Sequence, residues 1–281
     1  IIIINIFFLL IFLFLQNNFF LNINIFYSKK DFLIFIISSM SIFLIGYFDD
    51  KFKISAVKKF FSMILLFTVI IIYGKGLLIQ EIKVSFLETS YFLPNYISII
   101  WTLLCFLLFV NALNMFDGIN YQVSIYSIFI SFFFVINNYF PIFFLILGMS
   151  LLFFLILNHN NKSFLGDSGS YLLGFVFSYF FIKFYNSTNL INTDQIVLFM
   201  IIPGIDLMRL FIYRIYKGNY PFTPDRNHLH HIMRLKNSLI ITNIKVLLLT
   251  IVPATLGFYF GYTYLFLAMQ IIIYFYFISK K

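Results

Sequence analysis

Long apolar stretches recur along this sequence and are its strongest constraint on folding. Ile, Leu and Phe run almost continuously in segments of about 20 residues, the length at which an α-helix crosses a bilayer. Of the 281 residues, 62% are apolar and 10% are charged, whereas about a quarter of the residues in a soluble domain are charged. The period-2 alternation of outer-membrane strands is absent. We therefore expect an all-α, polytopic integral membrane helical bundle.

Hydropathy predicts about ten membrane spans, which we assign to a single integral membrane domain over residues 1–281. The last apolar stretch is too long for one helix, and Gly257, Gly261 and Tyr262-Thr263 suggest a turn near its middle. The chain begins with Ile1 rather than Met, so we expect its true N-terminus to be missing. The expected spans are 1–21, 32–48, 57–79, 96–114, 121–137, 140–158, 170–186, 194–216 and two within 243–279.

Basic residues are distributed unevenly between the loops that join these spans. Fourteen of the 19 Lys and Arg fall in one set of alternating loops and five in the other. The positive-inside rule makes the basic set cytoplasmic, so the net charge of +9 sets membrane orientation rather than indicating nucleic-acid binding. All four histidines and five of the ten acids lie in the same loops, and a sixth acid, Asp206, lies three residues before one of them. These loops are 49–59, 111–120, 158–167, 209–245 and 280–281.

The first of these loops begins with two adjacent carboxylates, Asp49 and Asp50, in the segment GYFDDK at 46–51. Mg²⁺ prefers oxygen ligands and often uses one or two carboxylates together with substrate phosphates. The motif therefore suits a magnesium site. A solvated helix end that stops at polar residues is the alternative, and it is favoured when this motif is taken alone.

The second loop contains Asn111, Asn114 and Asp117 within NALNMFDGIN at 111–120. The spacing i, i+3, i+6 places the three polar groups on one face of a helix. Such groups at the end of a span either line a cavity or form hydrogen bonds between helices. Both interpretations stay open at this point.

The third loop reads FLGDSGS at 164–170 and places small residues around Asp167. Glycine permits close approach of the backbone to a phosphate, and the N-terminus of a helix offers free N–H groups. Asp167 or Ser168 can equally serve as the N-cap of the next span.

The fourth loop, PFTPDRNHLHH at 221–231, carries His228, His230 and His231 next to Arg226. A structural zinc site commonly includes cysteine. Cys105 is the single cysteine of the sequence and lies in a distant span, so neither such a zinc site nor an internal disulfide is expected. Recognition of an anion by Arg226 and the imidazoles fits the segment better. The alternative is an amphipathic segment at the membrane interface.

Just before the histidines, Pro203 and Gly204 interrupt an apolar span and are expected to break the helix. Asp206 follows, and Arg209 at i+3 is its obvious partner. A structural ion pair is at least as well supported as a ligand role.

Together the four motifs resemble the polyprenyl-phosphate N-acetylhexosamine-1-phosphate transferases of glycosyltransferase family 4, which include phospho-N-acetylmuramoyl-pentapeptide transferase. The motifs occur in the family's order. The family's first span and first cytoplasmic loop have no counterpart, as expected for an incomplete N-terminus. The resemblance implies transfer of a sugar-1-phosphate from a UDP-N-acetylhexosamine to undecaprenyl or another polyprenyl phosphate, with release of UMP.

The resemblance also implies residue roles. Asp50 and Asp167 would hold Mg²⁺, or Mn²⁺ in its place, and Asp49 would act beside the lipid phosphate as base or orienter. The implied catalytic residues are Asp49, Asp50, Asp117, His230 and His231. The implied substrate-binding residues are Asn111, Asn114, Asn120, Arg226 and His228. Many relatives carry a second Asp followed by Gly-Leu where this chain has Asn120-Tyr121-Gln122, which puts the uracil or sugar contact in doubt.

The interrupted histidine motif resembles the branch that starts O-antigen, common-antigen or teichoic-acid linkage units, so UDP-N-acetylglucosamine is the expected donor. The alternatives are the peptidoglycan enzyme and a non-catalytic polyprenyl-lipid transporter. A transporter predicts polar residues at mid-span, whereas here they cluster at one membrane face. We expect a multi-pass protein of the bacterial inner membrane with a cytoplasmic active site and no nucleic-acid partner. Homodimerisation is left open.

Overall fold

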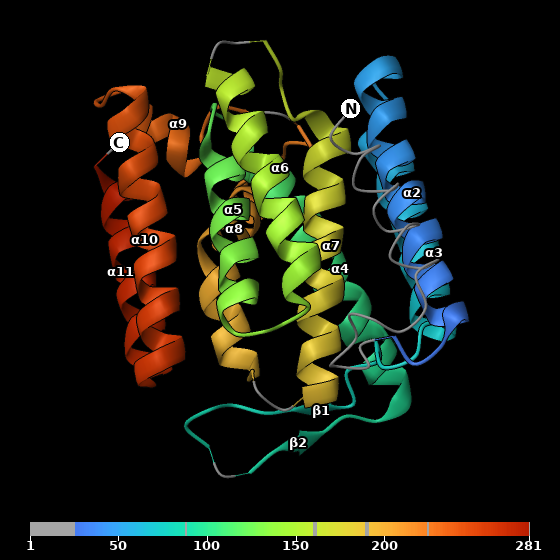
Figure 1. Ribbon diagram of the computed structural model, residues 1–281. Helices are drawn as coiled ribbons and strands as arrows, with labels where there is room; N and C mark the ends of the chain where they lie inside the picture. Colours follow the sequence, from blue (N-terminus) through green and yellow to red (C-terminus); the bar gives the residue numbers. More distant parts are fainter. Residues whose placement is uncertain (1–25, 88, 160–161, 189–190, 224, 281) are drawn as a thin grey trace.

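A computed structural model of the chain describes residues 26–87, 89–159, 162–188, 191–223 and 225–280. It shows a helical bundle with a two-stranded antiparallel hairpin at one end (Figure 1). The expected span 1–21 lies outside the described residues. The helices are α2 (Lys29–Phe52), α3 (Ala56–Tyr73), α4 (Asn95–Phe116), α5 (Gln122–Ile136), α6 (Pro141–His159), α7 (Gly166–Thr188), α8 (Thr193–Tyr216), α9 (Leu229–Arg234), α10 (Leu239–Phe260) and α11 (Thr263–Ser279). The strands are β1 (Glu81–Ile82) and β2 (Tyr91–Phe92).

The all-α membrane architecture expected from hydropathy is confirmed. Six helices of the described residues are long and apolar enough to cross a membrane, namely α2, α3, α4, α6, α8 and α10. The apolar helices α5 and α11 are shorter. The stretch 243–279 does divide in two, because α10 ends at Phe260 and α11 begins at Thr263. Gly261 has φ 75° and permits this reversal. The total of ten spans stays a prediction.

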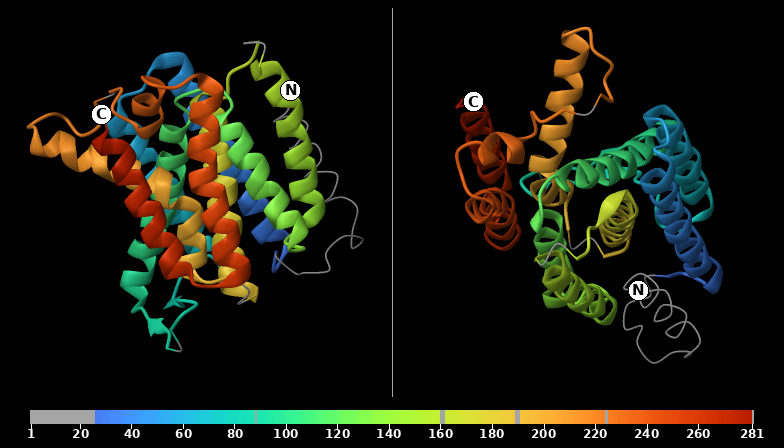
Figure 2. Two further views of the ribbon diagram at one scale, coloured as in Figure 1. Left: turned by 90° about the vertical axis from the view of Figure 1, so that its left-hand side faces the viewer. Right: turned by 90° about the horizontal axis from the view of Figure 1, so that it is seen from above.

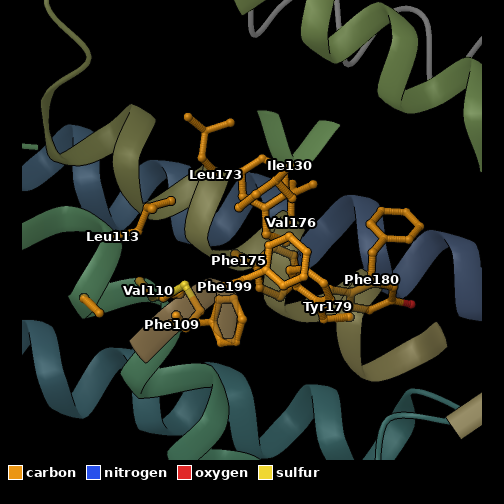
Figure 3. Packing of buried hydrophobic residues seen from close by; sticks show 14 of the residues in the cluster. Phe109, Val110, Leu113, Ile130, Leu173, Phe175, Val176, Tyr179, Phe180 and Phe199 are labelled. Atoms are coloured by element: carbon orange, nitrogen blue, oxygen red, sulfur yellow. The ribbon is translucent and has the colours of Figure 1, made fainter. Parts of the chain in front are cut away.

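Helix α7 occupies the centre of the bundle (Figure 2). Every residue from Gly169 to Tyr185 is buried, as expected for a helix that has neighbours on all sides. Its Phe175 and Tyr179 pack among aromatic and aliphatic side chains of the surrounding helices (Figure 3). Because α7 is packed on all sides, it rigidly supports the residues of its first turn.

Helix α8 is continuous, so the predicted break at Pro203-Gly204 is wrong. Proline lacks the N–H that would bond to the carbonyl four residues earlier, which here belongs to Phe199. The Tyr126 hydroxyl of α5 donates a hydrogen bond to that carbonyl instead. The neighbouring helix thus satisfies the group that proline leaves free, and α8 runs on to Tyr216.

The loops alternate between the two ends of the bundle, as the span assignment predicts. The β1–β2 hairpin lies at one end and α9 at the other (Figure 1). The four motif loops all lie at the end that carries α9, because α2 and α4 finish there and α7 starts there. The C-terminal end of α8 projects sideways from the bundle at this end (Figure 2).

Candidate active site at one end of the bundle

Three of the four motif loops line one cavity of about 320 Å³. It is bounded by acidic and amide groups on one side and by apolar side chains on the other. Asn114 and Asp117 of the second loop line this cavity, and Asn114 also donates hydrogen bonds to Asp167 and Ser170 of another helix, so both interpretations of this loop apply to Asn114. The lining residues are Asp50, Asn114, Asp117, Gly118, Ile119, Asn120, Ser124, Phe154, Asn158, Phe164, Leu165, Gly166 and Asp167.

Asp50 joins the end of α2 to the first turn of α7. Its Oδ1 accepts a hydrogen bond from the Asp167 N–H at 2.9 Å, and its Oδ2 accepts one from the Ser168 N–H at 3.1 Å. Gly166 makes this approach possible, because it has φ +66° and a Cβ there would lie 2.8 Å from Asp50 Oδ2. A carboxylate oxygen has further lone pairs, so Asp50 can still accept another ligand.

Asp167 lies between an amide and an ammonium group. Its Oδ1 accepts a hydrogen bond from Asn114 Nδ2 at 2.8 Å, and its Oδ2 is 3.6 Å from Lys59 Nζ. Lys59 also forms an ion pair with Asp49, which is buried. The lysine thus holds together two acids that repel each other, and it draws the first and third motifs into one charged cluster.

Asp117 faces the same acids without such a cation. Burial, together with the negative charges of Asp167 and Asp50, raises the pKa of Asp117 to about 8. In the absence of a bound cation, this carboxyl group is therefore largely protonated near pH 7. A divalent cation placed among these acids would replace that proton.

Two predicted asparagines lie differently from their neighbours. Asn111 donates a hydrogen bond to the Leu107 carbonyl of its own helix at 2.8 Å, and the same nitrogen lies 3.9 Å from the sulfur of Met63. It is not among the residues that line the cavity. Asn120 does line it, and its backbone carbonyl accepts a hydrogen bond from Asn243 at 3.0 Å. A role for Asn111 in substrate binding stays a prediction.

The histidine loop lies against the second motif. A Cβ on Gly118 would be 1.8 Å from Nε2 of His230, so only glycine leaves room for this ring. This Nε2 atom is buried, and no hydrogen-bond partner for it is found in the part of the chain that the structure describes. Burial, together with the neighbouring His231 and His228, lowers the pKa of His230 to about 3. The ring is therefore neutral near pH 7 and offers an N–H or a lone pair rather than a charge.

The other groups of the histidine loop are more accessible or are used for anchoring. Burial lowers the pKa of His231, and His228 and Arg226 lower it further. The Arg226 side chain is exposed. Asp225 accepts a hydrogen bond from Arg214 Nε at 2.8 Å, which ties the proline-framed entry of the loop to α8. The loop is thus held from α8, while His230 lies against Gly118 at the cavity.

Sequence reasoning missed some members of the site. Lys59 was visible only as one of several basic residues near the acids, and nothing in its spacing indicated that it would lie between Asp49 and Asp167. Asn158 donates a hydrogen bond to the Ser163 carbonyl and accepts one from the Tyr121 N–H, so it shapes the cavity wall. The only signal for Asn158 was its position at the end of an expected span.

The acids form no ready-made metal cage. Within the described ranges, no group of three or more His, Cys, Asp or Glu side chains is arranged to hold an ion. Their chemistry nevertheless suits Mg²⁺, which binds through oxygen, keeps several waters and takes further ligands from substrate phosphates. Asp50, Asp117 and Asp167 line the same cavity and would supply such oxygens.

An apolar groove of about 500 Å³ lies between α4, α7 and α8 and extends from the hairpin end of the bundle. Its walls include Trp101, Leu104 and Leu108 of α4, and Ile205 and Met208 of α8. Ile205 and Met208 flank Asp206, which contacts His228. Along α8 the groove lining thus runs from Thr193, at the hairpin end, to Met208, towards the end that carries the motifs.

The motifs at this end of the bundle fall largely within a recognised sequence family. Residues 32–185, more than half of the chain, match the profile of glycosyl transferase family 4. The chain belongs to glycosyl transferase family 4. The resemblance indicated by the motifs is thereby confirmed. Three of the motifs lie inside the matched range, and the histidine loop follows it.

Curated relatives of this glycosyl transferase family 4 protein share modest identity with it. An undecaprenyl-phosphate alpha-N-acetylglucosaminyl 1-phosphate transferase of Yersinia pestis is 27% identical over 208 residues, which cover 67% of this chain and 54% of the relative. The enzyme of the same name from Escherichia coli K12 is 26% identical over 215 residues, with the same coverage. One from Haemophilus influenzae is 36% identical over 73 residues, covering 26% of this chain and 21% of the relative. The chain spans about half the length of the first two relatives.

Proposed function

We propose that this protein transfers N-acetylglucosamine-1-phosphate from UDP-N-acetylglucosamine to undecaprenyl phosphate and releases UMP. One observation carries the proposal: a polar cavity lined by three acids lies at one end of a membrane bundle whose helices α4, α7 and α8 enclose an apolar groove. Such a site suits the joining of a water-soluble donor to a lipid acceptor. The names of the relatives supply the sugar and the lipid.

The apolar groove is the proposed seat of the polyprenyl chain. Its lining is almost wholly hydrocarbon and aromatic, which suits isoprene units and offers little to a sugar. The acceptor phosphate would then lie at the motif end of the bundle, near the acids of the cavity.

The acids supply the charge environment for phosphoryl transfer. Both substrates are anionic, and Mg²⁺ held by Asp50 and Asp167 would neutralise charge on the diphosphate, as metal ions commonly do in this chemistry. An oxygen of the lipid phosphate attacks the phosphorus that bears the sugar, and the bond to the UMP oxygen breaks. Asn114 keeps Asp167 in place by donating to its Oδ1.

Asp49 is proposed to orient the attacking phosphate or to act as its base. A phosphate monoester has a second pKa of about 6 and is mostly ionised near neutral pH, so it needs positioning more than deprotonation. The ion pair between Asp49 and Lys59 supports an orienting role, because the ammonium group can turn from the carboxylate towards a phosphate.

The histidine loop is proposed to bind the diphosphate. Buried Nε2 of His230 would donate to an oxygen of the leaving nucleotide, where charge develops in the transition state. Exposed Arg226 and half-buried His231 would contact the anion from the solvent side. Asn120, at the cavity wall, would contact the uracil or the sugar.

The two other functions are less well supported. A peptidoglycan enzyme would use UDP-N-acetylmuramoyl-pentapeptide as donor, and the interrupted histidine motif argues against it. A transporter requires polar groups along a path through the bilayer. The structure does bury a charged pair at the hairpin end, Asp31 and Lys183, but the two neutralise each other 2.5 Å apart.

Membrane orientation provides one test of the proposal, since UDP-sugars are cytoplasmic. The variant Lys162→Cys, in a Cys105→Ala background, should be shielded from a membrane-impermeant thiol reagent in intact cells, whereas Lys83→Cys should react. Lys162 precedes α7 at the motif end, and Lys83 follows β1 at the other end. Permeabilised cells give the control, because both variants should then be labelled. The reverse pattern would place the acids outside and rule out the donor.

Cation binding is expected to depend on pH. Because Asp117 has a pKa of about 8, Mg²⁺ has to displace its proton at lower pH. Affinity should therefore rise by about tenfold between pH 6.5 and 8.5. Calorimetry of the purified protein with MgCl₂ measures this, and Asp117→Asn should flatten the dependence. A pH-independent affinity in the parent protein would contradict the placement of the ion among these three acids.

A donor panel tests the reaction itself. Purified protein with undecaprenyl phosphate and Mg²⁺ should release UMP from UDP-N-acetylglucosamine faster than from UDP-glucose or UDP-N-acetylmuramoyl-pentapeptide. Preference for the pentapeptide donor would establish the peptidoglycan alternative. Absence of UMP with every donor would reject the proposed transferase.

A further inference from the structure

The carboxylate of Asp206 is the centre of a buried hydrogen-bond network behind the histidine loop. It accepts a hydrogen bond from His228 Nδ1 at 2.8 Å and from the Leu229 N–H at 3.1 Å. From its own helix it accepts one from Arg209 Nη2 at 2.9 Å, and from α11 it accepts one from the Tyr274 hydroxyl at 2.8 Å. Three segments that are distant in sequence therefore meet at one side chain.

These contacts assign different tasks to the partners. Arg209 also donates through Nε to the Tyr274 hydroxyl and through Nη2 to the Asn227 carbonyl, so its guanidinium is committed to the network. A carboxylate can only accept, so the His228 nitrogen that faces it carries the proton. His228 therefore has its Nε2 left for a ligand, and the carboxylate determines which nitrogen that is.

The ring of His228 lies close to the other two imidazoles of the loop. The rings of His228 and His230 are parallel within 3° with centroids 5.6 Å apart, and the His230 and His231 centroids are 4.3 Å apart. Nε2 of His230 in turn lies against Gly118 at the cavity loop. Asp206 thus lies at the start of a chain of rings that leads to the cavity.

We propose that Asp206 is a positioning residue for the transfer reaction: its carboxylate accepts a hydrogen bond from His228 Nδ1 and favours the doubly protonated ring, whose Nε2–H then donates to the phosphate oxygens of the leaving nucleotide. Tyr274 and Arg209 hold the carboxylate in the orientation that this requires. The inference rests on the proposed function, because it assumes a diphosphate at the histidine loop. It adds Asp206 and Arg209 of α8 and Tyr274 of α11 to the residues of the site.

A purely structural role makes a different prediction. If Asp206 and Arg209 only secured α8 to α11 through Tyr274, their loss would act on stability, and the effect would not depend on the presence of His228. The two roles are therefore separated by coupling between substitutions rather than by the size of one effect.

A double-mutant cycle on the purified protein tests the proposal. Asp206→Asn should lower kcat for UMP release by about 10- to 100-fold, with KM for UDP-N-acetylglucosamine within about threefold of the parent, since a positioned donor acts mainly in the transition state. His228→Ala should lower kcat at least as much. The double variant should match His228→Ala within about threefold, because Asp206 acts through that ring.

Tyr274→Phe is the second variant, for the case that Asp206→Asn does not fold. It removes one donor to Asp206 and leaves the carboxylate in place. It should lower kcat less than Asp206→Asn, and this loss should also vanish in the His228→Ala background. The matched control is Asp194→Asn, which changes a buried acid of the same helix at the other end, bonded to Ser85 and Thr263. Its kcat per folded protein should stay close to that of the parent.

Multiplicative losses in the double variants would overturn the proposal, and so would a kcat for Asp206→Asn equal to that of Asp194→Asn. A failure of the proposed function gives another result, because the parent protein itself would then release no UMP. The inference therefore fails only where the parent is active and the substitutions do not couple.

Discussion

The variant Asp167→Asn is expected to lose at least about 10³-fold in kcat for UMP release, which corresponds to several kcal/mol of transition-state stabilisation by a bound metal ion. The substitution removes a carboxylate that lines the cavity. It also replaces the carboxylate whose Oδ1 accepts a hydrogen bond from Asn114 and whose Oδ2 lies 3.6 Å from Lys59 Nζ by an amide. The measurement is UMP release at saturating substrates, compared at equal amounts of folded protein.

The matched control for Asp167→Asn is again Asp194→Asn, because it makes the same chemical change in a buried acid at the hairpin end of the bundle. Asp50→Asn should follow Asp167→Asn, since its oxygens hold the first turn of α7. Full turnover of the parent protein in excess EDTA, or a kcat for Asp167→Asn within tenfold of the parent, would contradict the metal assignment.

The second large effect is expected at His230. Removing one donor that stabilises developing charge typically lowers kcat by about 10²- to 10³-fold, and His230→Ala removes a buried Nε2 that faces the cavity loop. Substrate affinity should change less, because the donor acts mainly in the transition state. Kinetics that separate kcat from KM for the donor measure this.

Gly118→Ala gives an independent test of the same contact. Its Cβ would lie 1.8 Å from His230 Nε2, so the ring has to move and kcat should fall although every polar group remains. Gly148→Ala is the control, because its Cβ would meet Ser131 at an ordinary 3.4 Å. Activity of His230→Ala within about threefold of the parent, far below the loss expected of such a donor, would favour a passive interfacial segment.

The helical architecture could be predicted because a span is encoded locally. About 20 consecutive apolar residues are long enough to cross the bilayer as a helix, and this does not depend on the neighbouring segments. The turn at Gly261 was predicted for the same reason, since glycine there adopts φ 75° at no cost from a side chain. The continuity of α8 was not predicted, because it depends on Tyr126 of another helix reaching the Phe199 carbonyl.

The sequence predicted which loops form the site, but it predicted only some of the contacts between their residues. The motifs indicated that Asp50, Asp117 and Asp167 would meet at one face, and they do line one cavity. The rotamer of Asn111, which turns back to Leu107, depends on packing that no spacing rule describes. The bond between Asp206 and His228 joins residues 22 positions apart, and sequence spacing pointed only to Arg209.

The fate of the phosphorus that bears the sugar tests the central claim most directly. UDP-N-acetylglucosamine labelled at that phosphorus is incubated with the purified protein, undecaprenyl phosphate and Mg²⁺, and the organic and aqueous phases are then separated. We expect the label in the lipid, joined to the sugar as a lipid-linked diphosphate, and an equal amount of unlabelled UMP in the aqueous phase. Label recovered as aqueous UDP beside a glycosylated lipid would show transfer of the sugar alone and would contradict the account.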